Sequence, residues 1–196
     1  MAKIHFLNVD EGDCSIIEHN DGKVTMIDIC CGNIVQDKIQ KTFCAESLNG
    51  GMKGDFHQKK HPTNPVDYIR FHNIRKIFRY IQTHPDMDHM DGLQNLAESV
   101  EILNFWDTDN KKDQTFDDKS GKYYKKYWDC YCKLRNSKES PKALVYYDGQ
   151  SNKYYAENEH GVLSDDYLQI LSPTKELIRA ANKAVDWNDS SDVILY

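Results

Sequence analysis

The spacing of apolar and polar positions predicts a chain of short strands and helices. Residues 4–9, 14–18 and 24–29 are each rich in Ile, Val and Met and have the length of strands. Asn20-Asp21-Gly22 supplies a tight turn between the second and the third. We therefore expect an antiparallel hairpin arrangement at the beginning of the chain.

Strands and helices alternate after this hairpin. Residues 76–83 predict a buried strand, and apolar residues at helical spacing follow from Leu93 to Val100. A helix is expected to begin at Asn64-Pro65, because Pro is favoured at the first helical position. The remaining predictions are a long loop over 32–64, strands at 101–106, 143–147, 167–171 and 191–196, and a helix over 175–185. This order predicts an α/β fold.

Composition narrows the class of protein. The chain has 196 residues, of which 39% are hydrophobic and 29% charged, as expected for one globular domain. No apolar stretch is long enough to span a membrane and no signal peptide precedes the first strand, so we expect a cytoplasmic protein with no membrane partner. The net charge of −6 argues against a generally basic nucleic-acid binder. The six cysteines suit neither a disulfide framework nor a zinc ribbon.

The most informative motif lies between the strand at 76–83 and the helix that follows it. His84, Asp86, Asp88 and His89 are four side chains that can bind metal, all within six residues on a strand-to-helix loop. Active sites gather at the carboxyl ends of strands in α/β proteins, so we predict a metal site here. The alternative is a polar loop in which Asp88 or Asp91 caps the helix and the histidines are incidental.

A second candidate site lies in the Lys- and Tyr-rich segment 107–141. Its aromatic residues fall on one face of a predicted helix, interleaved with lysines. Such a face could stack bases and bind phosphates, with Lys125, Lys126 and Trp128 as the candidate contacts. The alternative is an amphipathic helix that packs its aromatic face on the domain.

The metal motif, followed by Gly92-Leu93, resembles the metal loop of metallo-β-lactamase-fold hydrolases. It is most similar to the branch typified by the hydrolase domain of the DNA-uptake competence protein ComEC, which also has Asp where many members have His. Outer segments of the chain are similar to the same branch in the same order: Phe6 to Cys14, Ile27-Asp28 with Gly32, Leu171 to Pro173 and Asn188 to Ser191. The resemblance covers residues 1–196 as the N-terminal portion of the domain, with 107–141 as an insertion.

This resemblance implies a fold and a set of ligands. The fold would be an αββα sandwich, incomplete at the C-terminus, and a missing C-terminal half or a partner polypeptide would complete it. His84 and Asp86 would bind one divalent ion, and Asp88 and His89 the other, with zinc as the first choice and manganese as the alternative. Asp28 would orient a ligand without touching the ions, although a strand-end Asp that caps backbone is equally compatible.

The resemblance also implies an activity. Two divalent ions roughly 3.5–4 Å apart can share a water, lower its pKa and clamp the oxygens of a displacement. We therefore expect a metal-dependent phosphodiesterase or nuclease that acts on DNA or RNA through a metal-bound water, with Asp88 as a catalytic residue. Two alternatives remain at this point: a hydrolase of a small ester, lactone or nucleotide, and a non-catalytic subunit that binds a partner.

Overall fold

The computed structural model describes residues 1–34, 62–114, 116, 124–150, 155 and 160–183, and these form a six-stranded mixed sheet with four α-helices. The sheet follows chain order from one edge to the other. Its strands are β1 (Lys3–Phe6), β2 (Ser15–Glu18), β3 (Val24–Ile27), β4 (Lys76–Ile81), β5 (Glu101–Asp107) and β6 (Lys142–Val145). The α/β prediction is confirmed at this level.

The first three strands form the predicted antiparallel meander. β1 pairs with β2, and β2 pairs with β3, so that Ile16 lies opposite Met26. Both side chains are completely buried. Gly22 closes the turn between β2 and β3 with a φ of 82°, a conformation that glycine adopts at no steric cost.

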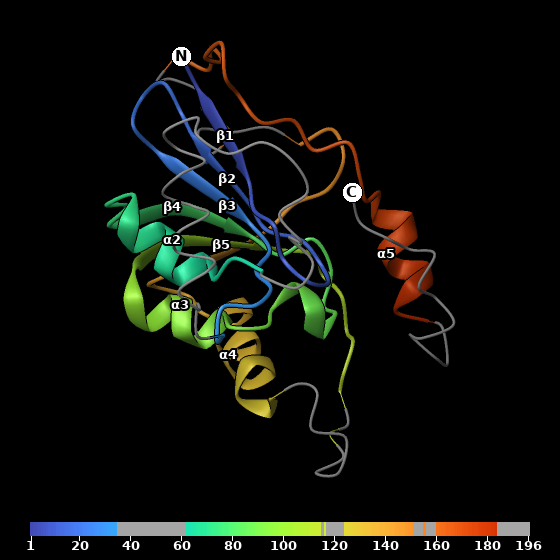
Figure 1. Cartoon of the computed structure of the whole chain (residues 1–196). Coiled ribbons are helices and arrows are strands. Elements are labelled where there is room, and N and C mark those ends of the chain that lie inside the picture. The colour runs from blue at the N-terminus through green and yellow to red at the C-terminus, as the bar shows by residue number, and fades with distance from the viewer. Residues whose placement is uncertain (35–61, 115, 117–123, 151–154, 156–159, 184–196) are drawn as a thin grey trace.

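The other half of the sheet is parallel, and each of its connections contains a helix. β3, β4, β5 and β6 pair in sequence, with α2 (Pro65–Phe71), α3 (Leu93–Ser99) and α4 (Lys125–Arg135) between successive strands. Connections between parallel strands share one handedness. When successive strands lie side by side in chain order, the helices that connect them therefore fall on the same face of the sheet. Figure 1 shows the three helices together on one side of the sheet.

Local sequence explains where these helices begin and what they bury. The side chain of Asn64 accepts hydrogen bonds from two backbone N–H groups in the first turn of α2, and Pro65 follows it, as predicted. In α4 the buried face consists of Tyr127, Trp128, Tyr131 and Leu134, which pack in the same core as the apolar residues of β4 and β5. This confirms the alternative in which the aromatic residues of α4 pack on the domain.

A smaller apolar cluster covers part of the opposite face of the sheet. It is built on Trp106, Tyr146 and Tyr155, and Leu168 and Ile170 pack against it. The prediction of a strand at 167–171 is wrong, because this segment lies on the cluster as irregular chain. A short helix, α5 (Lys175–Ala181), follows it, and the expected strand at 191–196 lies outside the described residues.

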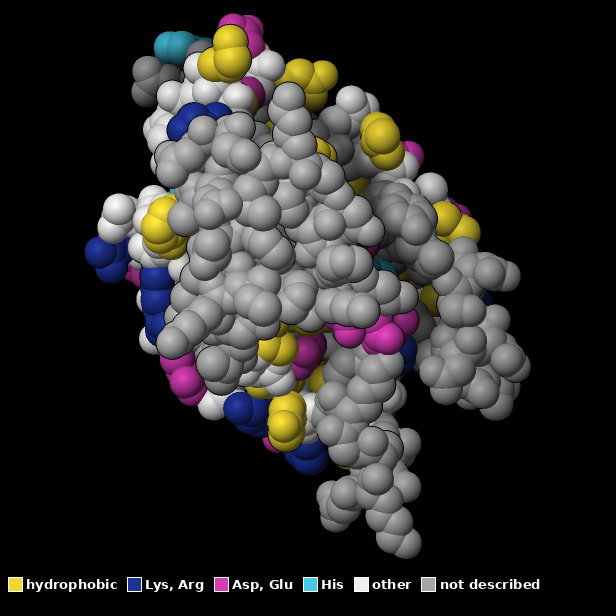
Figure 2. All heavy atoms as spheres, in the orientation of Figure 1, with side chains coloured by type: hydrophobic (Ala, Val, Ile, Leu, Met, Phe, Trp, Pro, Cys, Tyr) yellow, Lys and Arg dark blue, Asp and Glu magenta, His cyan; other side chains and the backbone are white. Residues whose placement is uncertain are grey.

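Several large apolar side chains remain exposed, among them Phe6 at 80% and Leu171 at 71%. On the face drawn in Figure 2 the hydrophobic side chains are scattered, with charged groups between them. Scattered exposure of this kind is ordinary for a globular protein. Within the described part of the chain, no helix has the length and hydropathy to cross a membrane.

The parallel strands bring four loops together at one end of the sheet, the end at which these strands finish, which we call the carboxyl edge. Asp28 follows β3, the loop 84–92 follows β4, residues 108–112 follow β5, and Tyr147 follows β6. The carboxyl ends of parallel strands all point to this edge, which is where α/β proteins place ligands. The sheet therefore brings together side chains that are more than 100 residues apart.

Candidate metal centre

The loop after β4 turns sharply and is held at both of its ends by one side chain. Residues Met87–His89 form a short 3₁₀ turn, η2. The amide nitrogen of Gln82 donates to the backbone carbonyl of His84 at 2.9 Å and to that of His89 at 3.0 Å. Gln82 is buried, so these hydrogen bonds are not exposed to competition from water. They fix the spacing between the two histidines.

Two neighbouring segments hold the same loop from the outside. The backbone N–H of Ile29 donates to the carbonyl of His89 at 3.1 Å, and that of Gly32 donates to the carbonyl of Asp91 at 3.0 Å. Gly12 lies so close to Asp88 that an added Cβ would come within 2.0 Å of its carbonyl oxygen. The loop is therefore a packed part of the domain.

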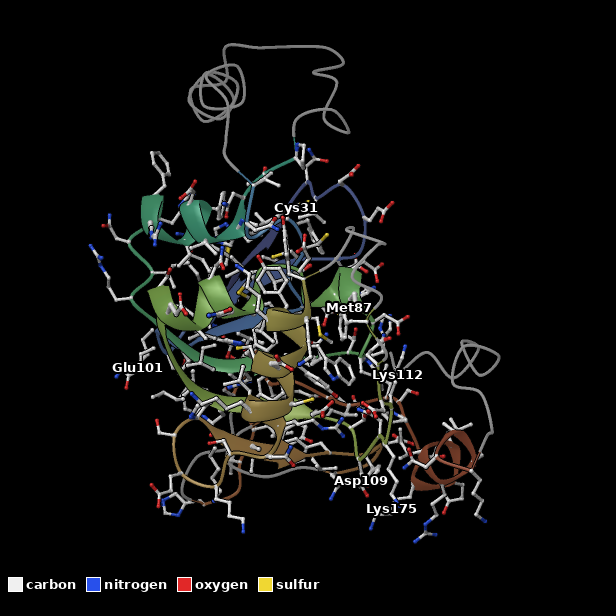
Figure 3. All side chains as sticks on the ribbon, turned by 90° about the horizontal axis from the view of Figure 1, so that it is seen from below. Cys31, Met87, Glu101, Asp109, Lys112 and Lys175 are labelled. Atoms are coloured by element: carbon white, nitrogen blue, oxygen red, sulfur yellow. The ribbon has the colours of Figure 1, made fainter. Side chains whose placement is uncertain are left out.

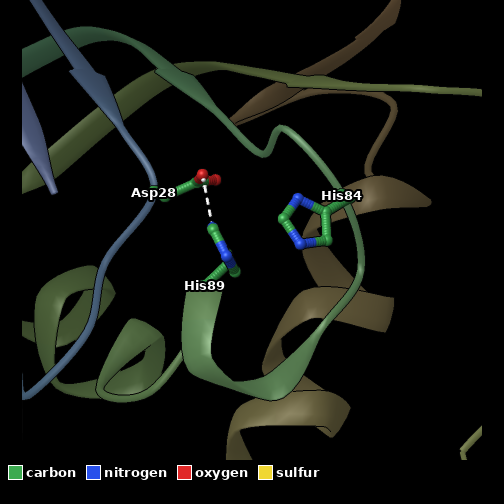
Figure 4. A group of neighbouring side chains, drawn as sticks. All are labelled: Asp28, His84 and His89. Atoms are coloured by element: carbon green, nitrogen blue, oxygen red, sulfur yellow. Dashed lines mark hydrogen bonds and ion pairs between the residues drawn. The ribbon is translucent and has the colours of Figure 1, made fainter. Parts of the chain in front are cut away.

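A hydrogen-bonded chain centred on Asp28 orients both imidazole rings. Nδ1 of His89 donates to the carboxylate of Asp28 at 2.8 Å, as Figure 4 shows. The hydroxyl of Thr83 donates to the same carboxylate and accepts from Nδ1 of His84 at 3.0 Å. Each ring thereby carries a proton on Nδ1, so Nε2 is the nitrogen that is unprotonated when the ring is neutral. Unprotonated Nε2 is the form that binds metal.

The two Nε2 atoms each face a carboxylate. Nε2 of His84 lies 3.7 Å from Oδ2 of Asp86, and Nε2 of His89 lies 3.7 Å from Oδ2 of Asp88. Two atoms bound to one tetrahedral ion, with bonds of about 2.0 Å, lie about 3.3 Å apart. The ring centroids of His84 and His89 are 3.8 Å apart, so the two pairs are adjacent. The predicted binding of one ion by each pair stays a prediction, because the group of donors that lie close enough together to hold one ion contains Asp28 with the two histidines and neither Asp86 nor Asp88.

Asp28 is close enough to be a ligand itself, since suitable atoms of Asp28, His84 and His89 all lie within 4.8 Å of one another. Its carboxylate already accepts hydrogen bonds from both Thr83 N–H and O–H, from Gln82 and from His89. A buried carboxylate with four donors has its acceptor sites filled. Asp28 thus both orients the ring of His89 and accepts from the backbone N–H of Thr83, so it combines the two roles that its place at the end of β3 allowed.

The two histidines differ in their affinity for a proton. Burial lowers the pKa of His84, and the neighbouring His89 lowers it further. Burial also disfavours the charged form of His89, but the hydrogen bond to Asp28 and the nearby carboxylates outweigh it and raise the pKa of this residue. The carboxylates that favour an imidazolium at this position would equally favour a divalent cation.

Lys112 contributes a positive charge that the sequence does not predict. It follows β5, its side chain is buried, and its ammonium group forms an ion pair with Asp86. The side chains of Asp86 and Asp88 are 43% and 34% exposed, so the site opens to solvent beside this lysine. An ammonium group here compensates part of the negative charge of the loop.

The geometry disfavours the alternative in which the loop carboxylates only cap a helix. Gly92 is the N-cap residue of α3, with a φ of 101°, and no side chain forms a capping hydrogen bond there. Gly92 also packs directly against Gly32, where a side chain would not fit. The two aspartates between the histidines are thus available to the site.

The remaining candidate residues do not join this centre. Trp128 is 5% exposed and lies in the core, so its ring cannot stack on a base. Lys125 forms an ion pair with Asp129 on the surface of α4, and Lys126 lies over the rings of Tyr124 and Tyr127. The nucleic-acid contact of these two lysines stays a prediction. His160, a histidine that is not part of the metal motif, is exposed and outside the group of donors.

Sequence reasoning missed Gln82, Thr83 and Lys112. Gln82 and Thr83 are the two polar residues directly between β4 and the metal motif, and this position could have identified them. Nothing local distinguishes Lys112 from the other lysines of its segment, because its role depends on β5 lying next to β4.

Comparisons with known proteins do not add to this geometry. No protein-family model matches the chain, and no curated protein sequence matches it.

Proposed function

We propose that this protein is a divalent-metal-dependent hydrolase of phosphodiester bonds and that its substrate is nucleic acid. The observation that supports this most is the hydrogen-bonded chain from Asp28 to both histidines, which occupies each Nδ1 and leaves each Nε2 beside a carboxylate, that of Asp86 or Asp88. An arrangement that controls the tautomers of two adjacent histidines has a clear use in binding metal.

In this proposal each imidazole–carboxylate pair holds one ion. His84 with Asp86 and Asp88 with His89 are the two pairs, and mixed nitrogen and oxygen donors suit zinc first and manganese second. Bound divalent ions would supply an activated water and would stabilise the charge that develops on phosphate oxygens. Asp88 is the proposed catalytic residue, because the oxygen that does not face His89 can accept a proton from the attacking water.

The surroundings of the site favour a phosphodiester over a small neutral ester. The carboxylates are partly exposed to solvent, whereas a small-substrate site is expected to be a closed and mainly apolar pocket. Lys112 lies at the site, and the exposed Lys111 precedes it. Cations beside the reacting position assist an anionic substrate and give little advantage to a neutral one.

The finer fold prediction belongs to the same proposal. One sheet with the three connecting helices α2, α3 and α4 on a single face is what half of an αββα sandwich would contribute. The non-catalytic alternative, in which the chain only binds a partner, predicts a folded protein with no metal-dependent activity.

The test is cleavage of labelled single-stranded and double-stranded DNA and RNA in the presence of zinc or manganese. We expect cleavage by the wild type, loss of cleavage with a chelator, and a loss of at least a hundredfold in His84→Ala and Asp88→Asn. His160→Ala is the matched control, since it removes an exposed histidine outside the site and should leave the rate unchanged. Equal cleavage in wild type and Asp88→Asn, or cleavage that survives the chelator, would refute the proposal.

A further inference from the structure

A pocket lies at the carboxyl edge of the sheet, next to the candidate metal centre and separate from it. Its volume is about 480 Å³, and it lies between α5 and the residues that follow β5 and β6. Asp109, Tyr147, Lys175 and Arg179 line it, with Val145 and Ile178 as the apolar part of its wall. None of these residues belongs to the metal centre.

The pocket and the metal centre are joined by one short segment, 109–112. The side chain of Asn182 donates to the carbonyl of Asp109 at 2.7 Å and accepts from the backbone N–H of Lys111 at 2.7 Å. One residue further on, Lys112 forms the ion pair with Asp86. Figure 3 shows Met87, Lys112, Asp109 and Lys175 in succession along one side of the molecule, with Glu101 on the opposite side.

The charges of the pocket suit an anion. The ammonium group of Lys175 lies 5.3 Å from the centre of the Tyr147 ring, and Arg179 is on the same exposed side of α5, one helical turn later. Among the described residues neither cation forms an ion pair. The one carboxylate in the wall, Asp109, lies 3.5 Å from the hydroxyl of Tyr147 and offsets a single charge. The lining is therefore net positive in a chain whose net charge is −6.

We propose that this pocket binds a backbone phosphate of a nucleic-acid strand that also reaches the metal centre. Lys175 and Arg179 would contact the phosphate oxygens, and the exposed Lys111 would lie beside the nucleic acid on its way to the metal centre. The inference rests on the proposed function, because it takes the metal centre as the place of cleavage. It also moves the expected contact surface from α4, whose aromatic residues are buried, to α5.

The pocket gives the chain a way to distinguish a strand from a mononucleotide. A mononucleotide bound at the metal centre would contact only that centre, whereas an oligonucleotide would also reach Lys175 and Arg179 in the pocket. Phosphate contacts set affinity and register without reading sequence. We therefore expect tighter binding of oligonucleotides than of mononucleotides and little preference for base sequence.

The test is binding of fluorescent single-stranded oligonucleotides, DNA and RNA separately, measured by anisotropy in EDTA so that metal and cleavage play no part. Lys175→Ala/Arg179→Ala should weaken binding about tenfold at low salt and should reduce the slope of log K against log salt by about 1.4, since two contacts are lost. Lys138→Ala/Lys142→Ala removes the same charge from exposed positions at the other end of β6 and is the control.

The two proposals fail separately. If both double variants bind as the wild type does, the pocket is not a phosphate site, whatever the cleavage assay shows. If binding falls in the α5 variant but no preparation cleaves with metal, the phosphate site stands and the hydrolase proposal is wrong. Equal losses in both double variants would mean that only net charge matters, and this would overturn the inference.

Discussion

The carboxylate of Asp28 and Nδ1 of His89, 61 residues apart, form a 2.8 Å hydrogen bond at the carboxyl edge of the sheet. Asp28 reaches this position because it leaves β3 with a φ of 53°, which turns its side chain towards the loop after β4. Through Thr83 the same carboxylate also controls His84. One buried side chain thus orients both imidazoles.

The first prediction concerns this carboxylate. Asp28→Asn should lower metal affinity about 10- to 100-fold, because the amide cannot accept from all the donors that the carboxylate serves. Asn is tolerated at positive φ, so the backbone should be retained. Competition with a chromogenic chelator measures the affinity, and circular dichroism checks the fold. Unchanged affinity in a folded variant would exclude the positioning role.

Thr83 allows a test of the hydrogen bonds that connect Asp28 to His84 through the Thr83 hydroxyl. Thr83→Val keeps the shape of the side chain and removes the hydroxyl between Asp28 and His84, so metal affinity should fall about tenfold. Thr83→Ser keeps the hydroxyl and should bind metal as the wild type does. Nuclear magnetic resonance of ¹⁵N-labelled histidine reports the tautomer directly. A His84 ring that keeps its Nδ1 proton in the valine variant would contradict the assignment.

We expect a side chain at position 12 to be unfavourable for two reasons: Gly12 contacts the loop at Asp88, and its φ is positive. Gly12→Ala brings a methyl group onto the carbonyl of Asp88 at a φ of 64°, and we expect about 3 kcal/mol of destabilisation with weaker metal binding. Gly22 has a similar φ of 82° but open space around it, so Gly22→Ala should cost only about 1 kcal/mol and leave metal binding intact. Urea unfolding of the two variants separates conformational strain from displacement of the loop.

His19 predicts a pH dependence of stability that does not involve the metal centre. Burial, and next the charge of Arg79, lower the pKa of this histidine, whose ring bonds to Thr25 at 2.8 Å. The unfolded chain therefore binds the proton more tightly than the folded one, and stability rises with pH. The contribution is present above the unfolded pKa of about 6.5 and is lost as pH falls through the folded pKa.

This dependence can be measured by urea unfolding at pH 5 to 8 in EDTA. The free energy of unfolding of the wild type should fall towards pH 5, and His19→Gln should fall less. Other histidines titrate in both proteins, so the difference between the two curves isolates His19. Parallel curves would mean that His19 has the same pKa in the folded and unfolded states.

Local signals predicted most of the secondary structure and the centre of the site. The strands on either side of the loop 84–92, the helix that begins after Asn64 and the four candidate ligands of that loop follow from patterns within ten residues. The segment 167–171 shows the limit of such patterns. Its apolar residues suit an edge strand or a segment that lies across a sheet face, and it packs on Trp106 and Tyr155 in the second way. Periodicity does not distinguish the two.

The parts of the site that sequence did not predict depend on which strands are neighbours. Lys112 meets Asp86 because β5 lies beside β4, and the pocket at Tyr147 exists because β6 lies beside β5. Trp128 on the aromatic face of α4 was a candidate nucleic-acid contact, but it is buried in the core. Aromatic residues along one face of a helix can either stack on bases or pack in a core, and only their burial in the structure distinguishes the two roles.

The central claim is that the loop after β4 binds divalent metal. Elemental analysis of the purified protein, after dialysis against zinc and again against manganese, tests it most directly when His84→Ala/His89→Ala is measured beside the wild type. We expect close to two equivalents in the wild type, and almost none in the double variant with an unchanged circular dichroism spectrum. Wild-type protein that is folded and retains no metal, or a variant that retains as much as the wild type, would contradict it.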